Sequence, residues 1–279
     1  MRHRVGFMQG RLSPPVDGRI QAFPHDQWHE EFALASEADL RIMEWTLDHE
    51  QLHENPLMTT SGRREIRRLS GLHGVTVPSL TGDCFMQAPF WKATGNQRNE
   101  LESVVQTVLE ACHAAGISTV VVPLVDEGSP ANETEEESLV RFLLAQVEAL
   151  DRHGLQVAFE SDLPPPALAA FIARFPAGLF GINYDIGNSA SLGFDPVEEF
   201  AAYGTRIVNV HVKDRHLGGG TVALGDGNAK FEAVFAGLSV LGYSGNFILQ
   251  TARDPKGNHL SSLVRFRDMT EDWMMQHGL

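Results

Sequence analysis

Residues 155–160 read LQVAFE, a short apolar run that ends in a polar residue, and the chain repeats this pattern three times. The repeats are LFGINYD (179–185), RIVNVH (206–211) and NFILQ (246–250). Runs of this length, rich in β-branched and aromatic residues, are typical of buried strands in a parallel sheet. They predict four neighbouring strands, each closed by a polar side chain.

The four closing residues are Glu160, Asp185, His211 and Gln250. Because the carboxyl ends of parallel strands meet at one edge of a sheet, we expect these side chains to converge. Two carboxylates, an imidazole and an amide form an oxygen and nitrogen ligand set for a divalent metal. A polar rim without a metal is the alternative interpretation.

Strand-like and helix-like segments alternate along the whole chain. Apolar runs predict strands at 5–8, 40–45, 75–80, 119–124, 156–159, 180–184, 207–212 and 247–249. Helices are predicted between them at 28–38, 65–73, 98–115, 135–153, 166–175, 196–203, 231–241 and 260–275. Eight strand–helix units in 279 residues favour a (β/α)₈ TIM barrel of the α/β class, with residues 1–279 as a single domain.

Composition narrows the range of partners. The net charge of −14, without a large basic cluster, disfavours nucleic acid and favours a small-molecule substrate. No run approaches the roughly 20 apolar residues of a membrane span, so we expect no membrane partner. The opening MRHRVGFMQG is too short and too polar for a secretion signal. With two cysteines, Cys84 and Cys112, we expect free thiols and a cytoplasmic protein.

Seven short motifs occur in order along the chain. They are MQGRLSPP (8–15), IMEWTLD (42–48), VAFES (157–161), NYDIGNS (183–189), HVKDR (211–215), LGDGNAKF (224–231) and FILQTAR (247–253). Together they resemble the xylose isomerase-like TIM barrels, the sugar (phosphate) isomerase/epimerase superfamily. The resemblance implies a metal-dependent isomerase or epimerase of a small carbohydrate or keto-sugar, and a homo-oligomer, which is common in that family.

The resemblance also implies roles for individual residues. Glu160, Asp185 and His211 take the positions of metal ligands, and Glu160 is also the catalytic acid/base. Gln250 takes the fourth position, where the family has a glutamate that is both ligand and acid/base. Asn188 stands where the family often has histidine. The implied cofactor is a divalent ion, Mn²⁺ or Mg²⁺ first, with Co²⁺ or Zn²⁺ as alternatives.

The amide of Gln250 has two chemical consequences. It can still bind a metal, but two carboxylates replace three around the ion, so we expect weaker metal binding. It cannot take up a proton near neutral pH, so one acid/base of the family's pair is missing. Epimerisation usually needs two opposed groups, whereas isomerisation through an enediol can use Glu160 alone. We therefore favour an isomerase, with Lys213, Asp214 or a water on the metal as substitutes for the second group.

Predicted substrate contacts lie at the strand ends and in the loops that follow them. The resemblance implies that Glu44 contacts the substrate or positions neighbouring residues, and an ion pair with an arginine such as Arg11 is the alternative. The same alternatives, substrate contact or an ion pair, apply to Asp83. Aromatic side chains near strand ends either stack on a sugar or fill the core. They are Trp45, Phe85, Phe90 and Trp91. The glycine-rich segment 217–228 is predicted to be a mobile lid.

The remaining predicted contacts are Asn188, Lys213, Asp214, Arg215 and Arg253. One residue of 213–215 is expected to orient His211. With Arg11, the basic members would form a positive rim for an anionic sugar, and ordinary ion pairs are the alternative.

Three other functions use the same residues. A metal-dependent lyase or hydrolase would share the enediolate chemistry. A catalytically altered metal- or sugar-binding homologue would explain Gln250 and Asn188. A phosphodiesterase like the apurinic-site endonucleases is disfavoured, because only His211 ends a strand run, with His216 nearby, and no basic face is present.

Overall fold

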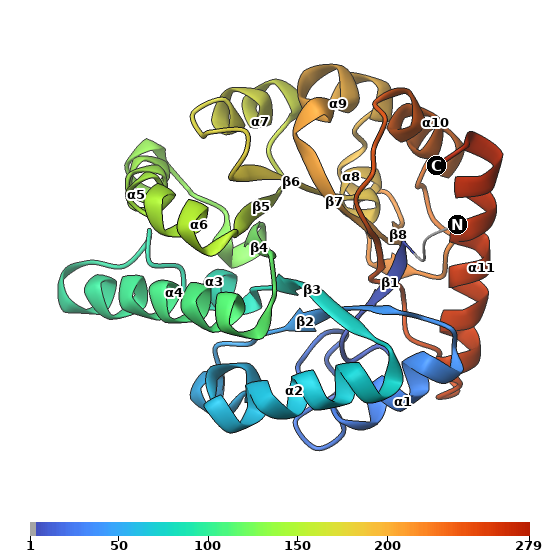
Figure 1. Ribbon diagram of the computed structural model, residues 1–279. Coiled ribbons are helices and arrows are strands. Elements are labelled where there is room, and N and C mark those ends of the chain that lie inside the picture. The colour runs from blue at the N-terminus through green and yellow to red at the C-terminus, as the bar shows by residue number, and fades with distance from the viewer. Residues whose placement is uncertain (1–3) are drawn as a thin grey trace.

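Eight apolar segments of the sequence become the strands of a closed parallel barrel. The computed structural model describes residues 4–279, and in it the strands form a central ring with the helices outside (Figure 1). The order around the ring is β1-β10-β7-β6-β5-β4-β3-β2. The strand bounds are β1 (Val5–Met8), β2 (Ile42–Thr46), β3 (Thr76–Thr81), β4 (Thr119–Leu124), β5 (Gln156–Ser161), β6 (Phe180–Asp185), β7 (Ile207–Val212) and β10 (Phe247–Leu249). The predicted (β/α)₈ barrel is therefore confirmed.

The predicted strand bounds agree closely with those observed. β1, β4, β7 and β10 begin and end at the predicted residues. β5 and β6 continue through the polar residues at their ends, because these residues still pair with a neighbour: Ser161 with Leu124, and Asp185 with His211. The polar side chains are thus fixed by the sheet itself.

The principal helices lie around the outside of the barrel, where they connect consecutive strands, and the last of them, α11, follows the final strand β10 (Figure 1). Their bounds are α1 (Glu30–Glu37), α2 (Thr60–His73), α4 (Gly95–Ala115), α5 (Glu133–Ala145), α6 (Val147–His153), α7 (Pro165–Ile172), α9 (Pro196–Tyr203), α10 (Phe231–Val240) and α11 (His259–His277). Asp195 caps α9 by accepting the N–H of Val197, and Gly116 and Gly154 end α4 and α6 in the left-handed conformation. The helix predicted at 135–153 is two helices, α5 and α6, because Gln146 interrupts it.

Short elements on the carboxyl-end rim were not predicted. α3 (Asp83–Gln87) follows β3, α8 (Ile186–Leu192) follows β6, and the two-stranded hairpin β8 (Asp214–Arg215) and β9 (Thr221–Val222) follows β7. The remaining turns are 3₁₀ helices η1 (Leu52–Glu54), η2 (Pro56–Met58), η3 (Asp126–Gly128) and η4 (Gly204–Arg206). They are too short for helical periodicity to be visible in sequence.

Apolar side chains fill the layer between the strands and the helices, whereas the inside of the barrel is partly polar. Phe159, Phe180 and Phe247 are fully buried in the apolar core. Asn209 and His211 lie two residues apart on β7, and Asn183 and Asp185 do so on β6, so each pair faces the same side of the sheet. Within residues 4–279, no helix has the length and apolar character needed to cross a membrane.

Candidate active site

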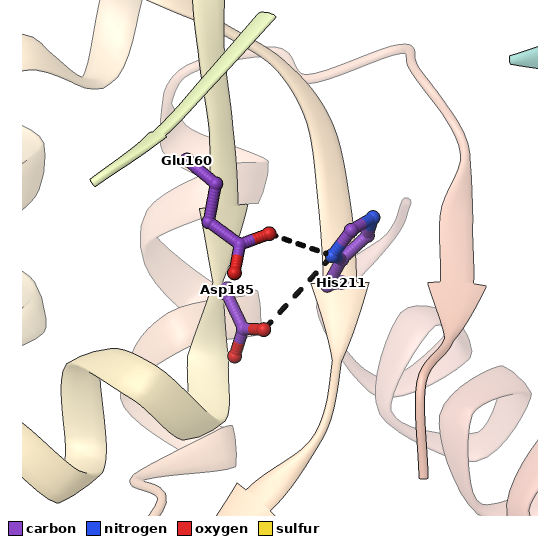
Figure 2. A group of neighbouring side chains, drawn as sticks. All are labelled: Glu160, Asp185 and His211. Atoms are coloured by element: carbon purple, nitrogen blue, oxygen red, sulfur yellow. Dashed lines mark ion pairs between the residues drawn. The ribbon is translucent and has the colours of Figure 1, made fainter. Parts of the chain in front are cut away.

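Three predicted ligands meet at the carboxyl end of the barrel. Glu160 on β5, Asp185 on β6 and His211 on β7 each offer one ligand atom, and these atoms lie within 4.8 Å of one another. Glu160 Oε2 is 3.1 Å and Asp185 Oδ2 is 3.9 Å from His211 Nδ1 (Figure 2). All three residues are buried. Two carboxylates and an imidazole gathered this closely are a chemically suitable set for a divalent ion.

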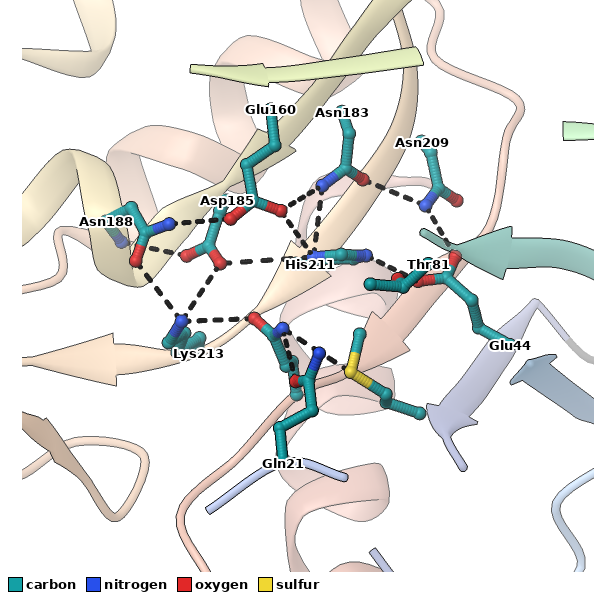
Figure 3. Close-up of polar contacts among 12 residues, drawn as sticks. Gln21, Glu44, Thr81, Glu160, Asn183, Asp185, Asn188, Asn209, His211 and Lys213 are labelled. Atoms are coloured by element: carbon teal, nitrogen blue, oxygen red, sulfur yellow. Dashed lines mark hydrogen bonds and ion pairs between the residues drawn. The ribbon is translucent and has the colours of Figure 1, made fainter. Parts of the chain in front are cut away.

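A contact with Glu44 orients the imidazole of His211. His211 Nε2 lies 2.7 Å from Glu44 Oε1, and both side chains are fully enclosed. This contact directs Nδ1 toward Glu160 and Asp185, and Asn183 Nδ2 also lies 3.0 Å from it (Figure 3). Burial alone would lower the pKa of His211, but the charges of Glu44 and Glu160 and their hydrogen bonds raise it to about 10. A carboxylate behind a histidine ligand is a common way to fix the ring in metal sites.

Glu44 is itself held by three donors, which explains why a carboxylate is tolerated inside the barrel. Ser79 Oγ, Thr81 Oγ1 and Asn209 Nδ2 donate to it at 2.7, 2.5 and 2.9 Å. Although burial opposes the charged form, His211 and these hydrogen bonds keep the pKa of Glu44 below its ordinary value. The predicted ion pair of Glu44 with Arg11 is wrong. Glu44 is fully buried and positions its neighbour His211, which is the second of the two roles that the resemblance implied for it.

Glu160 is fixed by two amides. Asn188 Nδ2 donates to Oε1 at 2.7 Å, and Asn183 Nδ2 donates to Oε2 at 2.9 Å. Burial would raise the pKa of Glu160, but His211 and Lys213 outweigh that effect and lower it. The carboxylate is therefore ionised and oriented, as a metal ligand or a general base must be.

Lys213 brings a positive charge into the same cluster. Its Nζ lies 3.3 Å from Asp185 Oδ2, 3.2 Å from Asn188 Oδ1 and 3.1 Å from Gln250 Oε1. Gly187 permits this approach, since a Cβ there would come within 2.6 Å of Lys213 Cγ. Burial raises the pKa of Asp185, and the neighbouring Lys213 ammonium opposes that rise.

Gln250 lies beside the three ligands, but both ends of its amide are engaged. Its Oε1 accepts from Lys213, and its Nε2 donates to Gln21 Oε1 at 2.8 Å and approaches Met8 Sδ at 3.4 Å. The amide oxygen that was predicted to bind the metal thus accepts a hydrogen bond from the Lys213 ammonium. Gln250 joins the site as a link between Lys213 and Gln21.

A cavity of about 390 Å³ opens above the cluster. Of the predicted substrate contacts, it is lined by Asp83, Asn188, Lys213 and Arg215, together with Glu160 and Gln250. Arg215 Nη1 donates to Asn188 Oδ1 at 2.9 Å, which ties this wall to the ligand cluster. These residues are positioned to meet a bound molecule.

Other predicted contacts lie elsewhere and must be corrected. Trp45 is fully buried and its Nε1 donates to Asn55 Oδ1, so it fills the core. Asp214 is fully buried and accepts the N–H groups of three residues in the glycine-rich segment, Gly225, Gly227 and Ala229. Asp214 therefore holds residues 225–229, the end of this segment, against the hairpin. The side chains that contact His211 belong to Glu44, Asn183, Glu160 and Asp185, so no residue of 213–215 orients it.

The predicted positive rim is also wrong. Arg253 donates to Ser13 O and Ile20 O, and Arg11 donates to Ile20 O and Gln21 Oε1. Neither arginine lines the cavity above the ligands. Instead, both hold the loop after β1 across the barrel mouth, which places Ile20 and Gln21 in the cavity wall. The aromatic side chains of Phe85, Phe90 and Trp91 are buried in the core, and His216 does not line the cavity.

Sequence reasoning missed Asn183, Asn209 and Gln21, and also Ser79 and Thr81, which donate to Glu44. The two asparagines stand two residues before Asp185 and His211, where the strand period of two turns them to the same face. A polar residue inside an apolar run was the available signal. Gln21 lies in a long loop, and nothing in its surroundings in the sequence distinguishes it.

Comparison with known proteins is consistent with this geometry. A family model described as xylose isomerase-like TIM barrel matches residues 32–269. L-ribulose-5-phosphate 3-epimerase UlaE from Salmonella paratyphi C is 25% identical over 215 residues, covering 74% of this chain and 75% of the relative.

Two solved structures show the same fold. The IolI protein with a bound zinc atom has a TM-score of 0.75 at 15% identity, covering 98% of this chain and 99% of the other. D-psicose 3-epimerase from Clostridium cellulolyticum H10, solved with D-tagatose, has a TM-score of 0.74 at 11% identity, covering 97% and 99%.

Proposed function

The chain belongs to the xylose isomerase-like TIM barrel family, and from that premise we propose that it is a metal-dependent enzyme that moves a proton on a ketose. The observation that carries the proposal is the cluster of Glu160, Asp185 and His211 beneath the cavity. Relatives named as sugar epimerases support an isomerase or epimerase.

Glu160 is the base. Its carboxylate lines the cavity, and Asn183 and Asn188 hold both of its oxygens, so it is presented to a bound sugar in one orientation. It removes a proton from the carbon next to the substrate carbonyl, which leaves an enediolate. A divalent ion at this site would supply positive charge for the enediolate oxygen.

Lys213 and Arg215 orient the substrate. They border the cavity from β7 and the hairpin, and their donors reach Asn188 Oδ1 at 3.2 and 2.9 Å. Asn188 also holds Glu160, so the groups that meet the sugar and the base share one support. A small displacement of the sugar relative to Glu160 would slow the reaction strongly, because the reacting atoms must be held close together.

The charges of the cavity favour a neutral ketose over a sugar phosphate. Its walls carry four carboxyl groups against two cations. Lys213 is paired with Asp185, and Arg215 is engaged by Asn188 and by Gly219 O. A phosphate would therefore meet carboxylates without a free basic group. The carboxyl groups belong to Asp83, Asp126, Glu160 and Asp162.

The cofactor proposed is Mn²⁺ or Mg²⁺, with Co²⁺ or Zn²⁺ as alternatives. Glu160, Asp185 and His211 would hold it. Two carboxylates and one imidazole suit each of these ions, and the relative solved with zinc shows that the fold accommodates that ion.

The proposal is tested by solvent exchange. The protein, supplied with Mn²⁺, is incubated in D₂O with L-ribulose, D-tagatose or L-ribulose 5-phosphate, and deuterium at carbon is followed by NMR. We expect incorporation into a neutral ketose and its loss in Glu160→Gln, whereas Glu148→Gln on the exposed face of α6 retains it. Exchange that survives Glu160→Gln would show that the base is another group, and exchange into none of the sugars would refute the proposed activity.

A further inference from the structure

Asp83 is a carboxyl group of the cavity that the proposed reaction has not used. It begins α3, directly after β3, and only 6% of its surface is exposed. It lines the same cavity as Glu160. Gln21 Nε2 donates to its Oδ2 at 2.5 Å, and within residues 4–279 no donor reaches its Oδ1. One oxygen is therefore free to meet a molecule in the cavity.

Two hydrogen bonds connect Asp83 to Gln250, the residue that stands where the family has its second carboxylate. Gln250 donates to Gln21, and Gln21 donates to Asp83, so two amides connect the end of β10 to the start of α3. Gln21 lies on the other side of His211 from Glu160 (Figure 3). In the strand order, β3 stands opposite β7, so Asp83 and Lys213 border the cavity from opposite sides.

The surroundings of Asp83 favour its protonated form. Burial is the main cause, the charges of Asp48 and Glu160 add to it, and Arg11 and the Gln21 hydrogen bond oppose it, so that its pKa rises to about 7. α3 packs on β4 and η3, from which Asp126 also faces the cavity. A carboxyl group that titrates near neutral pH both gives and takes protons efficiently.

We propose that Asp83 is the second proton-carrying group of this site and that it makes the enzyme an epimerase of neutral ketoses. This inference rests on the proposed function. Glu160 takes the proton from carbon, and the electrons of the broken C–H bond form the enediolate. Asp83 then gives its proton to the same carbon from the β3 side of the cavity, two strands around the ring from Glu160 on β5, and the carbonyl re-forms. Glu160 ends protonated and Asp83 ionised, and exchange with water resets both; the reverse reaction exchanges their roles.

The first test observes the carboxyl group without any substrate. The protein is labelled with ¹³C at the aspartate carboxyl carbon, and the resonance that disappears in Asp83→Asn is titrated. We expect a midpoint near pH 7 for Asp83 and an upward shift in Gln21→Met, which removes the hydrogen bond to the charged form. A midpoint near pH 4, the ordinary range of an aspartate, would overturn the inference even if the enzyme is active.

The second test separates proton removal from inversion. Deuterium exchange and epimer formation are measured together with L-ribulose and D-tagatose. In Asp83→Asn we expect the Glu160-dependent exchange to continue, while interconversion of epimers falls by at least ~100-fold. Asp39→Asn, an exposed aspartate that tolerates asparagine at its positive φ, serves as the control.

The outcomes distinguish failure of the role proposed for Asp83 from failure of the proposed function. Wild-type interconversion in Asp83→Asn overturns the role of Asp83 and leaves the proposed function standing. Exchange without any epimer formation by the wild-type enzyme also overturns it, in favour of an isomerase. Absence of exchange in the wild-type enzyme refutes the proposed function, and the epimerase assignment falls with it.

Discussion

Replacing Asp83 by asparagine should change how the stability of the protein depends on pH. In the folded protein the pKa of Asp83 is about 7, against 3.8 for an ordinary aspartate. Between these values the folded state binds more protons than the unfolded state, so stability is lost as pH rises from about 4 to 7. The asparagine in Asp83→Asn does not titrate, and it keeps a carbonyl that can accept the Gln21 hydrogen bond.

The size of the effect follows from the difference in pKa. Each unit corresponds to about 1.4 kcal/mol, so about three units give a loss on the order of 4 kcal/mol across the whole window. Between pH 5 and pH 8, the free energy of unfolding of Asp83→Asn should rise relative to wild type by on the order of 2–3 kcal/mol. Because Asp83 is almost fully buried, solvent screening removes little of this difference.

Urea denaturation of both proteins at several pH values, with a chelator present throughout, measures the difference directly. The two curves of stability against pH should diverge as pH rises and become parallel above pH 7. Curves that stay parallel from pH 5 to pH 8 would mean that Asp83 is ionised throughout, and the reasoning from burial and from the Asp48 and Glu160 charges would be refuted.

Four further perturbations have defined outcomes. Glu44→Gln removes the carboxylate behind His211 and should weaken Mn²⁺ binding by roughly 10–100-fold in a metal titration; unchanged affinity would mean that Glu44 does not tune the ligand. Gln250→Glu adds a third carboxylate beside Lys213 and should tighten Mn²⁺ binding by roughly tenfold. Gly187→Ala should lower the free energy of unfolding by roughly 1–3 kcal/mol and reduce activity, because its Cβ would meet Lys213. Asp214→Ala should speed hydrogen exchange of the Gly225, Gly227 and Ala229 amides, and unchanged protection there would exclude its role in holding the loop.

The barrel and its three ligands could be predicted from the sequence because both depend on local patterns. A buried parallel strand is a short apolar run, and its carboxyl end is marked by the polar residue that follows. Once the strands are parallel neighbours in one ring, convergence of Glu160, Asp185 and His211 follows from topology alone. No exact side-chain geometry was needed for that step.

The substrate contacts were harder to predict, because they depend on the direction in which each side chain points, and the sequence does not encode that direction. Glu44 and Trp45 are adjacent on β2, yet Glu44 turns into the barrel toward His211 and Trp45 turns outward into the core. The alternation of side chains along a strand predicts that Glu44 and Trp45 point to opposite faces of β2, but it does not say which face is polar. Asp83 and Gln21 meet only because the loop after β1 folds across the mouth, a long-range contact without a local signal.

Manganese binding followed by electron paramagnetic resonance tests the central assignment most directly. Mn²⁺ is titrated into the wild-type protein and into His211→Gln, and coupling of the ion to an imidazole nitrogen is recorded. We predict one bound ion per chain with a nitrogen coupling that disappears in His211→Gln. A wild-type protein that binds no ion, or a nitrogen coupling that persists in the variant, would contradict a metal held by Glu160, Asp185 and His211.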